Sequence, residues 1–184
     1  VHMSDIYNNY YQDAEPERYI RGSAPDPLRL EAGLVLEEMM ERGLRERLSA
    51  ESGRPGEFVE PEHGIIFSPD LIIFNHCTRV GEIKLTWMSS REVPRDICFS
   101  NAFPEKFSKW FSQMMLYCRA LETPYARLLA FFVNGDYSFV RKGGRTSVPA
   151  GPELLAWDLE FTRREMDEEW QTMMNHARQK RIIV

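Results

Sequence analysis

Two acidic residues and a lysine, Asp70, Glu82 and Lys84, have the side chains that metal-dependent hydrolysis of a phosphodiester requires. Three apolar, β-branched runs around them predict strands, with a turn between the last two: 64–68, 70–74 and 80–87. A hairpin of the last two strands would bring Asp70 beside Glu82. Two carboxylates placed side by side repel each other unless a divalent cation lies between them. The spacing therefore predicts a metal site on this hairpin.

The residue types around the hairpin suit a hard cation. Mg²⁺ and Mn²⁺ prefer oxygen ligands, which Asp70, Glu82 and the backbone carbonyl of Ile83 would supply to one or two ions. Side chains alternate along a strand, so Glu82 and Lys84 share one face. Lys84 would orient the attacking water and offset negative charge in the transition state. The alternative is a salt-bridged surface hairpin, because Glu-x-Lys is common on strands.

A third acid is predicted from helix geometry. Residues 28–49 lack proline and predict a helix, on which Glu37 falls within a stripe of leucines while Glu38 lies on the polar face. A carboxylate among leucines is costly unless a charged group meets it. We therefore expect Glu37 to share a metal with Asp70 and Glu82. The alternative is that Glu37 lies at the boundary of the stripe and stays solvated.

A later helix, predicted over about residues 104–121, carries a polar flank beside its apolar stripe. Gln113 and Tyr117 are four residues apart and project together, and Lys106 and Lys109 lie near the same flank. An amide, a phenol and two ammonium groups could hold a phosphate backbone. An ordinary polar rim of an amphipathic helix is the alternative.

Four short motifs, in order along the chain, resemble the PD-(D/E)XK nuclease superfamily, specifically its RecB-like and phage recombination-exonuclease branches. They are Gly33-x-x-x-Glu37, Pro69-Asp70, Glu82-Ile83-Lys84 and Gln113-x-x-x-Tyr117, and the resemblance covers about residues 28–135. It implies an α/β (α+β) fold with a restriction-endonuclease-like core, in which helices flank a central mixed β-sheet. It also implies Mg²⁺ or Mn²⁺ as cofactor and DNA as substrate.

The resemblance also implies roles for the motif residues. Asp70 and Glu82 would bind metal, Glu37 would bind it directly or through water, and Lys84 would be catalytic. Gln113 and Tyr117 would help to hold DNA near Lys84. Some RecB-like nucleases have a histidine at the position of Glu37, so the helix acid departs from that pattern.

The cysteines and histidines predict no second metal centre. Some RecB-like nucleases bind an iron–sulfur cluster through four cysteines, but this chain has only three, dispersed at Cys77, Cys98 and Cys118. We therefore expect no iron–sulfur cluster, and no Cys-x-x-Cys pair indicates structural zinc. His63 lies just before the first strand, where it either reaches the site or occupies an ordinary turn.

Length and composition predict one nuclease domain. The 184 residues suit a single domain, which we place at 28–184, behind an irregular, tyrosine-rich N-terminal arm at 1–27 whose default role is packing. The first three residues, Val1-His2-Met3, resemble a cloning remnant. The net charge of −5 is weak evidence against DNA, because a site that holds cations is itself acidic. A predicted basic loop offers local positive charge for DNA binding: Arg141, Lys142 and Arg145.

The remaining elements are predicted more coarsely. Residues 126–133 and 154–161 predict strands, and 162–180 predict a helix with an apolar face. Asn134-Gly135 predicts a hairpin turn into a strand at 137–140. No apolar run approaches the length of a membrane span, and no signal peptide is evident.

Together these patterns predict a metal-dependent deoxyribonuclease that processes DNA ends in recombination or repair. Alternatives are a structure- or sequence-dependent endonuclease of the same superfamily and a catalytically inactive DNA-binding subunit; RNA also stays open as substrate. We expect DNA as partner, with a homo-oligomer or a recombination or helicase partner compatible with this function, and no membrane. An odd number of scattered thiols indicates a reducing cytoplasm. The resemblance to RecB-like and phage exonucleases implies that it is the cytoplasm of a bacterium or of a phage-infected host.

Overall fold

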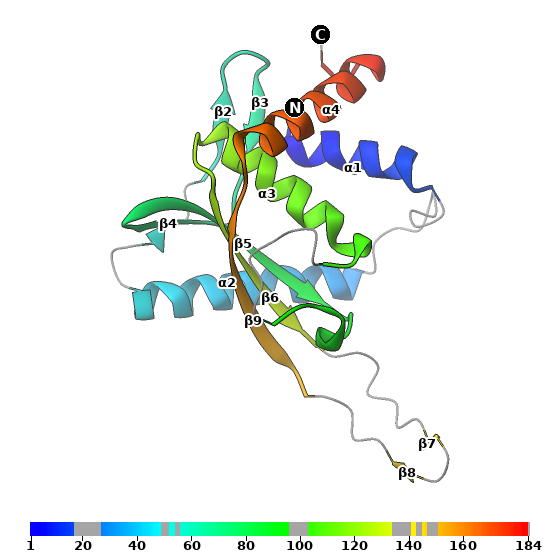
Figure 1. Ribbon diagram of the computed structural model, residues 1–184. Helices are drawn as coiled ribbons and strands as arrows, with labels where there is room; N and C mark the ends of the chain where they lie inside the picture. The colour runs from blue at the N-terminus through cyan, green and yellow to red at the C-terminus, as the bar shows by residue number, and fades with distance from the viewer. Residues whose placement is uncertain are drawn as a thin grey trace.

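The computed structural model describes residues 1–16, 27–48, 52–53, 56–95, 103–133, 141–142, 145–146 and 151–183. Within these ranges, the main sheet has the strand order β1-β4-β5-β6-β9 (Figure 1). Its strands are β1 (Ser52–Gly53), β4 (Leu71–Asn75), β5 (Cys77–Thr86), β6 (Tyr125–Phe132) and β9 (Glu153–Glu160). β5 and β6 run parallel, and the other neighbours are antiparallel. The predicted central mixed sheet is therefore confirmed.

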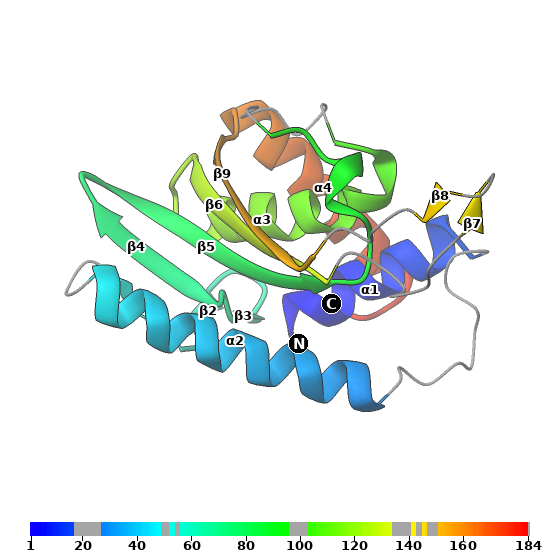
Figure 2. The ribbon, with the colours of Figure 1, turned by 90° about the horizontal axis from the view of Figure 1, so that it is seen from below.

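Helices cover both faces of this sheet, as the predicted fold class requires. They are α1 (Met3–Ala14), α2 (Pro27–Leu48), α3 (Ser108–Ala120) and α4 (Arg163–Gln179). Figure 2 shows α2 on one face, and α3 with α4 on the other. α3 forms the crossover that the parallel pair β5 and β6 needs, while α1 packs against α3 and α4.

Short elements complete the described chain. β2 (Phe58–Glu60) pairs with β3 (Ile65–Phe67), and β7 (Arg141–Lys142) pairs with β8 (Arg145–Thr146). Single 3₁₀ turns lie at Ser90–Glu92 and Glu105–Phe107. In the turn between β4 and β5, His76 has φ 50°, a left-handed conformation that lets Asn75 pair with Cys77. No helix in the described ranges combines the length and apolar character that a bilayer span requires.

The core lies between the sheet and the layer of α1, α3 and α4, and aromatic rings fill much of it. The Phe103 ring centroid lies 4.8 Å from that of Phe111 and 5.1 Å from that of Trp157. The Phe67 ring stacks on Trp170 at 6.1 Å. These edge and stacked contacts add to the free energy gained by burying the rings. The α3 side of the sheet is therefore close-packed.

The predicted strands at 126–133 and 154–161 and the last helix are confirmed by β6, β9 and α4. Thr162 caps α4, and its hydroxyl accepts a hydrogen bond from the Glu165 backbone while Glu165 bonds back to Thr162. The predicted apolar face of this helix is buried throughout: Met166, Trp170, Met173, Met174 and Ala177. The predicted turn at Asn134-Gly135, the predicted strand at 137–140 and Cys98 lie outside the described residues.

The prediction of an irregular arm over residues 1–27 is wrong for its first half, which is α1. Its buried residues follow helical spacing and join the core: Met3, Ile6, Tyr7 and Tyr11. The packing expected by default for this segment is present, but as a regular helix. The tyrosines concealed the period because each has an apolar ring and a polar hydroxyl.

Candidate active site

The β4–β5 hairpin places Asp70 next to Glu82, as predicted. Leu71 pairs with Gly81, so Asp70, one residue before β4, lies opposite Glu82 on β5. The Asp70 carboxylate is fixed there, because its Oδ2 accepts a hydrogen bond of 2.8 Å from the backbone N–H of Ile83. The backbone of Ile83 thus holds Asp70 through its N–H, and metal binding by its carbonyl stays a prediction.

Glu82 is the most deeply buried acid of the site, with 1% of its surface exposed. Its Oε1 accepts a hydrogen bond from Lys84 Nζ, whereas its Oε2 is buried with no hydrogen-bond partner among the described residues. Burial raises the pKa of Glu82, and the charges of Asp70 and Glu37 add to this shift against the opposing ammonium of Lys84. Lys84 therefore compensates only part of the negative charge here.

Lys84 is held by a chain of hydrogen bonds that crosses from the sheet to α3. Its Nζ donates to Gln113 Oε1 at 2.9 Å, and Gln113 Nε2 donates to the Tyr117 hydroxyl at 3.1 Å. That hydroxyl donates in turn to the Ser68 carbonyl at 3.4 Å. Because the Tyr117 proton goes to Ser68, its oxygen accepts from the Gln113 amide, which turns Gln113 Oε1 toward Lys84.

This chain of hydrogen bonds is interior, which corrects the expected surface role of its α3 residues. Gln113 is 8% exposed and Tyr117 only 3% exposed, so they do not form a flank that solvent or DNA covers. Burial raises the pKa of Tyr117, with the charge of Glu82 adding, and the phenol therefore stays protonated and can donate. Both residues belong to the chain of hydrogen bonds that holds Lys84, and their contact with DNA stays a prediction.

α2 brings Glu37 to the same place. Glu37 and Glu41 line a cleft of about 240 Å³ together with Asp70 and Ile83. Glu38 also lines this cleft, but its side chain is 69% exposed and pairs with Arg42 at 2.9 Å. The helix phase expected from the sequence, with Glu37 toward Asp70 and Glu38 toward solvent, agrees with this arrangement. For several of the leucines from which that helix phase was predicted, the side chains lie outside the described part of the structure.

The donor set of this cleft fits a hard divalent cation. Glu82 Oε2 is a buried oxygen without a partner in the described chain, and Asp70 and Glu37 supply further carboxylates near it. The carboxylate oxygens of Glu37, Asp70 and Glu82 do not all lie within 4.8 Å of one another. Direct binding by all three would therefore require one to move, whereas a water molecule can bridge the longest gap.

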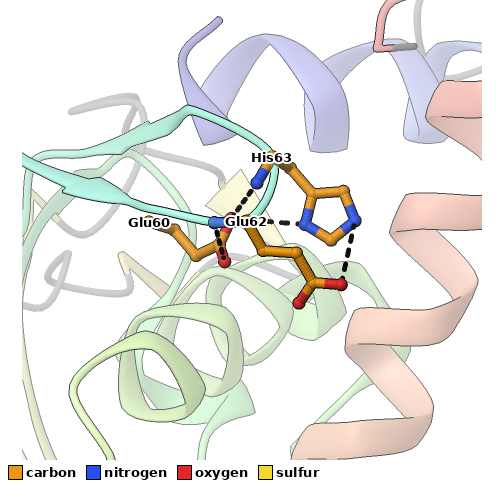
Figure 3. Close-up of side chains that lie close together, drawn as sticks. All are labelled: Glu60, Glu62 and His63. Carbon is orange, nitrogen blue, oxygen red and sulfur yellow. Dashed lines mark hydrogen bonds and ion pairs between the residues drawn. The ribbon is translucent and has the colours of Figure 1, made fainter.

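A second cluster holds candidate metal ligands closer to one another, but these side chains already form hydrogen bonds. Among the described residues, Glu60, Glu62 and His63 alone place three candidate ligand atoms within 4.8 Å of one another. Figure 3 shows Glu60 accepting hydrogen bonds from the backbones of Glu62 and His63, at 2.9 and 2.8 Å. His63 Nδ1 lies 3.3 Å from Glu60, and Arg178 donates to its Nε2 at 3.0 Å. The histidine occupies a turn, and its two ring nitrogens contact Glu60 and Arg178.

The predicted basic DNA-binding residues separate in the structure. Lys106 pairs with Glu92 and lies over the Phe107 ring. Lys109 lies elsewhere, with Nζ 5.4 Å from the Tyr7 ring centroid, and the charge of Lys84 acts on it. Three predicted residues have side chains outside the description: Arg141, Lys142 and Arg145.

Sequence reasoning missed two members of the site. The Ser68 carbonyl is a backbone group, so the residue type at this position gives no indication of its role. Tyr7 lies near the chain of hydrogen bonds, where its charge contributes to the pKa values of Lys84 and Tyr117. The spacing of Met3, Tyr7 and Tyr11 at intervals of four was the available signal for a helix that carries Tyr7 inward.

Comparison with known proteins bears on the fold alone. No family model and no curated protein matches the chain. The chain is similar to a solved structure described as "Crystal structure of SSO0001", with a TM-score of 0.50 and 13% sequence identity. The match covers 95% of this chain and 74% of that one. At this identity the likeness supports the α+β fold and carries no argument about chemistry.

Proposed function

We propose that this protein is a Mg²⁺- or Mn²⁺-dependent nuclease of the PD-(D/E)XK type that hydrolyses phosphodiester bonds of DNA. One observation carries the proposal. Glu82, buried beside Asp70, keeps one carboxylate oxygen on Lys84 and the other without a partner among the described residues. A purely structural ion pair would leave no such oxygen, because a buried acceptor without a partner is costly.

Each residue has a chemical role in this proposal. Glu82, Asp70 and, directly or through water, Glu37 would hold the metal. A bound metal would screen the phosphate charge and lower the pKa of a water molecule. Lys84 has three N–H donors, of which Glu82 and Gln113 accept two in the described structure. The third would serve a water molecule or a phosphate oxygen, since the Lys84 side chain is 21% exposed.

The protonation state of Lys84 suits this role. Burial alone would lower the pKa of Lys84, but the charges of Glu82, Asp70 and Tyr7 outweigh it and raise the pKa above its ordinary value. Lys84 thus stays an ammonium group. It would act as a fixed positive charge that stabilises the transition state and not as a general base.

The test is cleavage of end-labelled linear DNA and covalently closed circular DNA, with Mn²⁺, with Mg²⁺ and with EDTA. We expect metal-dependent cleavage that EDTA and Asp70→Asn abolish. Asp158→Asn is the matched control, because this exposed acid on β9 pairs with Arg127 outside the site. Full activity of Asp70→Asn would overturn the metal assignment. Cleavage of linear DNA alone indicates an exonuclease that processes ends, and cleavage of both forms indicates an endonuclease.

The role of Lys84 is tested separately from binding. Lys84→Ala should bind DNA normally but cleave it about 10²- to 10³-fold more slowly in single turnover, the usual effect of losing an electrostatic stabiliser. Lys180→Ala, on an exposed lysine after α4 that pairs with Asp13, is the control. DNA binding without cleavage under any metal would favour an inactive binding subunit. An RNA oligonucleotide of the same sequence tests the choice of nucleic acid.

A further inference from the structure

One face of α3 carries three polar residues in register. Lys109, Gln113 and Tyr117 are spaced by four residues, so they project from the same side of the helix. Gln113 and Tyr117 hold Lys84 through the chain of hydrogen bonds described above. Lys109 therefore stands one helical turn from the amide that positions the catalytic lysine.

Lys109 also contacts α1. Lys109 Nζ lies 5.4 Å from the centroid of the Tyr7 ring, within the range of a cation–π interaction. Tyr7 is 7% exposed and belongs to the core, so the ring is a fixed surface. α1 packs beside α3, and it also contacts α4 and β3 (Figure 2). Lys109 is thus held at the boundary between the core and the candidate active site.

Lys106, one turn earlier, has a different environment. Its ammonium group pairs with Glu92, and its Nζ lies 5.5 Å from the Phe107 ring centroid. An anion that approached Lys106 would have to compete with this carboxylate. Lys106 therefore serves as an internal control for any argument about Lys109.

We propose that Lys109, packed on Tyr7, forms a phosphate subsite beside Lys84 that binds the backbone of the nucleic-acid substrate, and that α1 is thereby part of the active site. The inference rests on the proposed function, because it takes Lys84 as the catalytic lysine. Its geometric basis is the shared face of α3, the Tyr7 ring beneath the Lys109 ammonium, and the single helical turn between Lys109 and Gln113, whose amide accepts a hydrogen bond from Lys84.

Charge supports this choice of ligand. Burial, together with the positive charge of Lys84, lowers the pKa of Lys109 to about 8. Two ammonium groups near each other in a partly buried place repel, and an anion that contacts both relieves the repulsion. The opposite side of the site is acidic, with Glu37, Glu41 and Asp70 lining the cleft. A phosphate without its own metal would therefore be attracted to the α1 and α3 side.

The first experiment measures how fast each lysine is acylated, by mass spectrometry of the wild-type protein at pH 8 in EDTA. A short single-stranded DNA should slow acylation of Lys109 several-fold and leave Lys106 unchanged. An oligonucleotide with a neutral methylphosphonate backbone should protect neither lysine. Unchanged acylation of Lys109 while fluorescence anisotropy shows DNA bound would overturn the subsite. Protection by inorganic phosphate without any DNA binding would support the subsite and overturn the proposed DNA nuclease.

The second experiment uses the salt dependence of DNA binding. Lys109→Met should reduce the slope of log affinity against log salt by about 0.7–0.9, the value of one lost phosphate contact. Lys106→Met should leave the slope unchanged, because Glu92 already neutralises that lysine. Equal slopes for Lys109→Met and wild type would overturn the proposal. Both lysines are partly exposed, so neither variant is expected to unfold the protein.

Variants of Tyr7 test whether α1 positions Lys109. Tyr7→Phe keeps the aromatic face and should retain DNA protection of Lys109, whereas Tyr7→Leu should weaken it. Tyr10→Leu is the control, since the Tyr10 ring packs on Tyr11 and His176 and not on Lys109. Thermal melting confirms folding of each variant. If Tyr7→Leu is unfolded, loss of protection in Tyr7→Phe, which should fold, would contradict the role assigned to the aromatic face.

Discussion

The helices on the two sides of the sheet differ in how deeply their apolar side chains are buried. A Cβ atom added to Gly33, on α2, would meet nothing within 4 Å among the described atoms. On the α3 side, large side chains such as Phe67 and Phe107 have no exposed surface. On α2, four apolar residues are more than half exposed: Leu28, Leu34, Val35 and Met39.

The two halves of the candidate site therefore differ in how firmly their side chains are held. Lys84 is fixed by Gln113 and Tyr117, which sit in the close-packed layer and allow it little freedom. Glu37 comes from the sparsely packed α2, where fewer contacts fix a side chain. In the proposed function, Lys84 is thus rigidly placed, while Glu37 has more freedom to adjust to an ion.

The largest effect is expected from truncating the packed layer. Phe107→Ala should lower the free energy of unfolding by about 3–5 kcal/mol, because the ring is fully buried and packs on Trp110 at 4.7 Å. Met39→Ala on α2, where the side chain is 62% exposed, should change it by less than about 0.5 kcal/mol. Urea unfolding followed by circular dichroism measures both. Similar losses in the two variants would remove the distinction between the faces.

Next comes the link between the packed layer and the chemistry. Gln113→Ala removes the amide that orients Lys84 and leaves that ammonium group short of an acceptor. Loss of a hydrogen bond to a charged group costs about 1.5–3 kcal/mol, so we expect cleavage to slow about 10- to 100-fold. Single-turnover cleavage, compared with DNA affinity, locates the defect in the chemical step. Gln171→Ala, at an exposed position of α4, is the control and should cleave normally.

The two glycines make a matched pair with opposite signs. Gly81→Ala should destabilise the fold by about 1–3 kcal/mol, since its Cβ needs room that Leu71 occupies. Gly33→Ala should stabilise it by about 0.5–1 kcal/mol, because alanine favours the helix and the position is open. The melting temperatures of the two variants show whether each substitution lowers or raises the stability. A loss of stability in Gly33→Ala would mean that α2 is packed more tightly than described.

The smallest effect concerns a carboxyl group inside the packed layer. Burial raises the pKa of Glu169, against the opposing hydrogen bond from Ser112. A raised folded-state pKa means that stability falls as pH rises from the unfolded pKa through the folded one. Glu169→Gln should therefore melt higher than wild type at pH 7, with a smaller difference at pH 4. The exposed neighbour Glu168→Gln, which loses its pair with Arg164, should show no such gain.

The sequence correctly predicted the helices and strands whose apolar residues repeat at one clear spacing. β4, β5, β6, β9, α3 and α4 all lie where apolar spacing placed them, and the hairpin brings Asp70 to Glu82 as expected. Asp70, Glu82 and Lys84 were picked out because Pro69-Asp70 precedes Glu82-Ile83-Lys84 at the spacing of a hairpin.

The rest depended on contacts between distant segments. Gln113 and Tyr117 have polar atoms and helical spacing, so the sequence placed them on a surface flank. The structure buries both, because the Ser68 carbonyl, 49 residues before Tyr117, accepts the phenol proton. Likewise, Lys106 and Lys109 are similar in sequence, and the structure separates them by their contacts, among them Glu92 for Lys106 and Tyr7 for Lys109.

The contact between α1 and α4 has a consequence for synthesis on the ribosome. α1 emerges first, but it packs against α3 and α4, and its Asn9 bonds to His176 of α4 at 3.0 Å. A 12-residue helix is marginal in water by itself. We therefore expect α1 to remain unfolded until the last helix has left the exit tunnel. Nascent chains that stop before Arg163 should leave Met3 and Ile6 accessible to protease, and completing α4 should protect them.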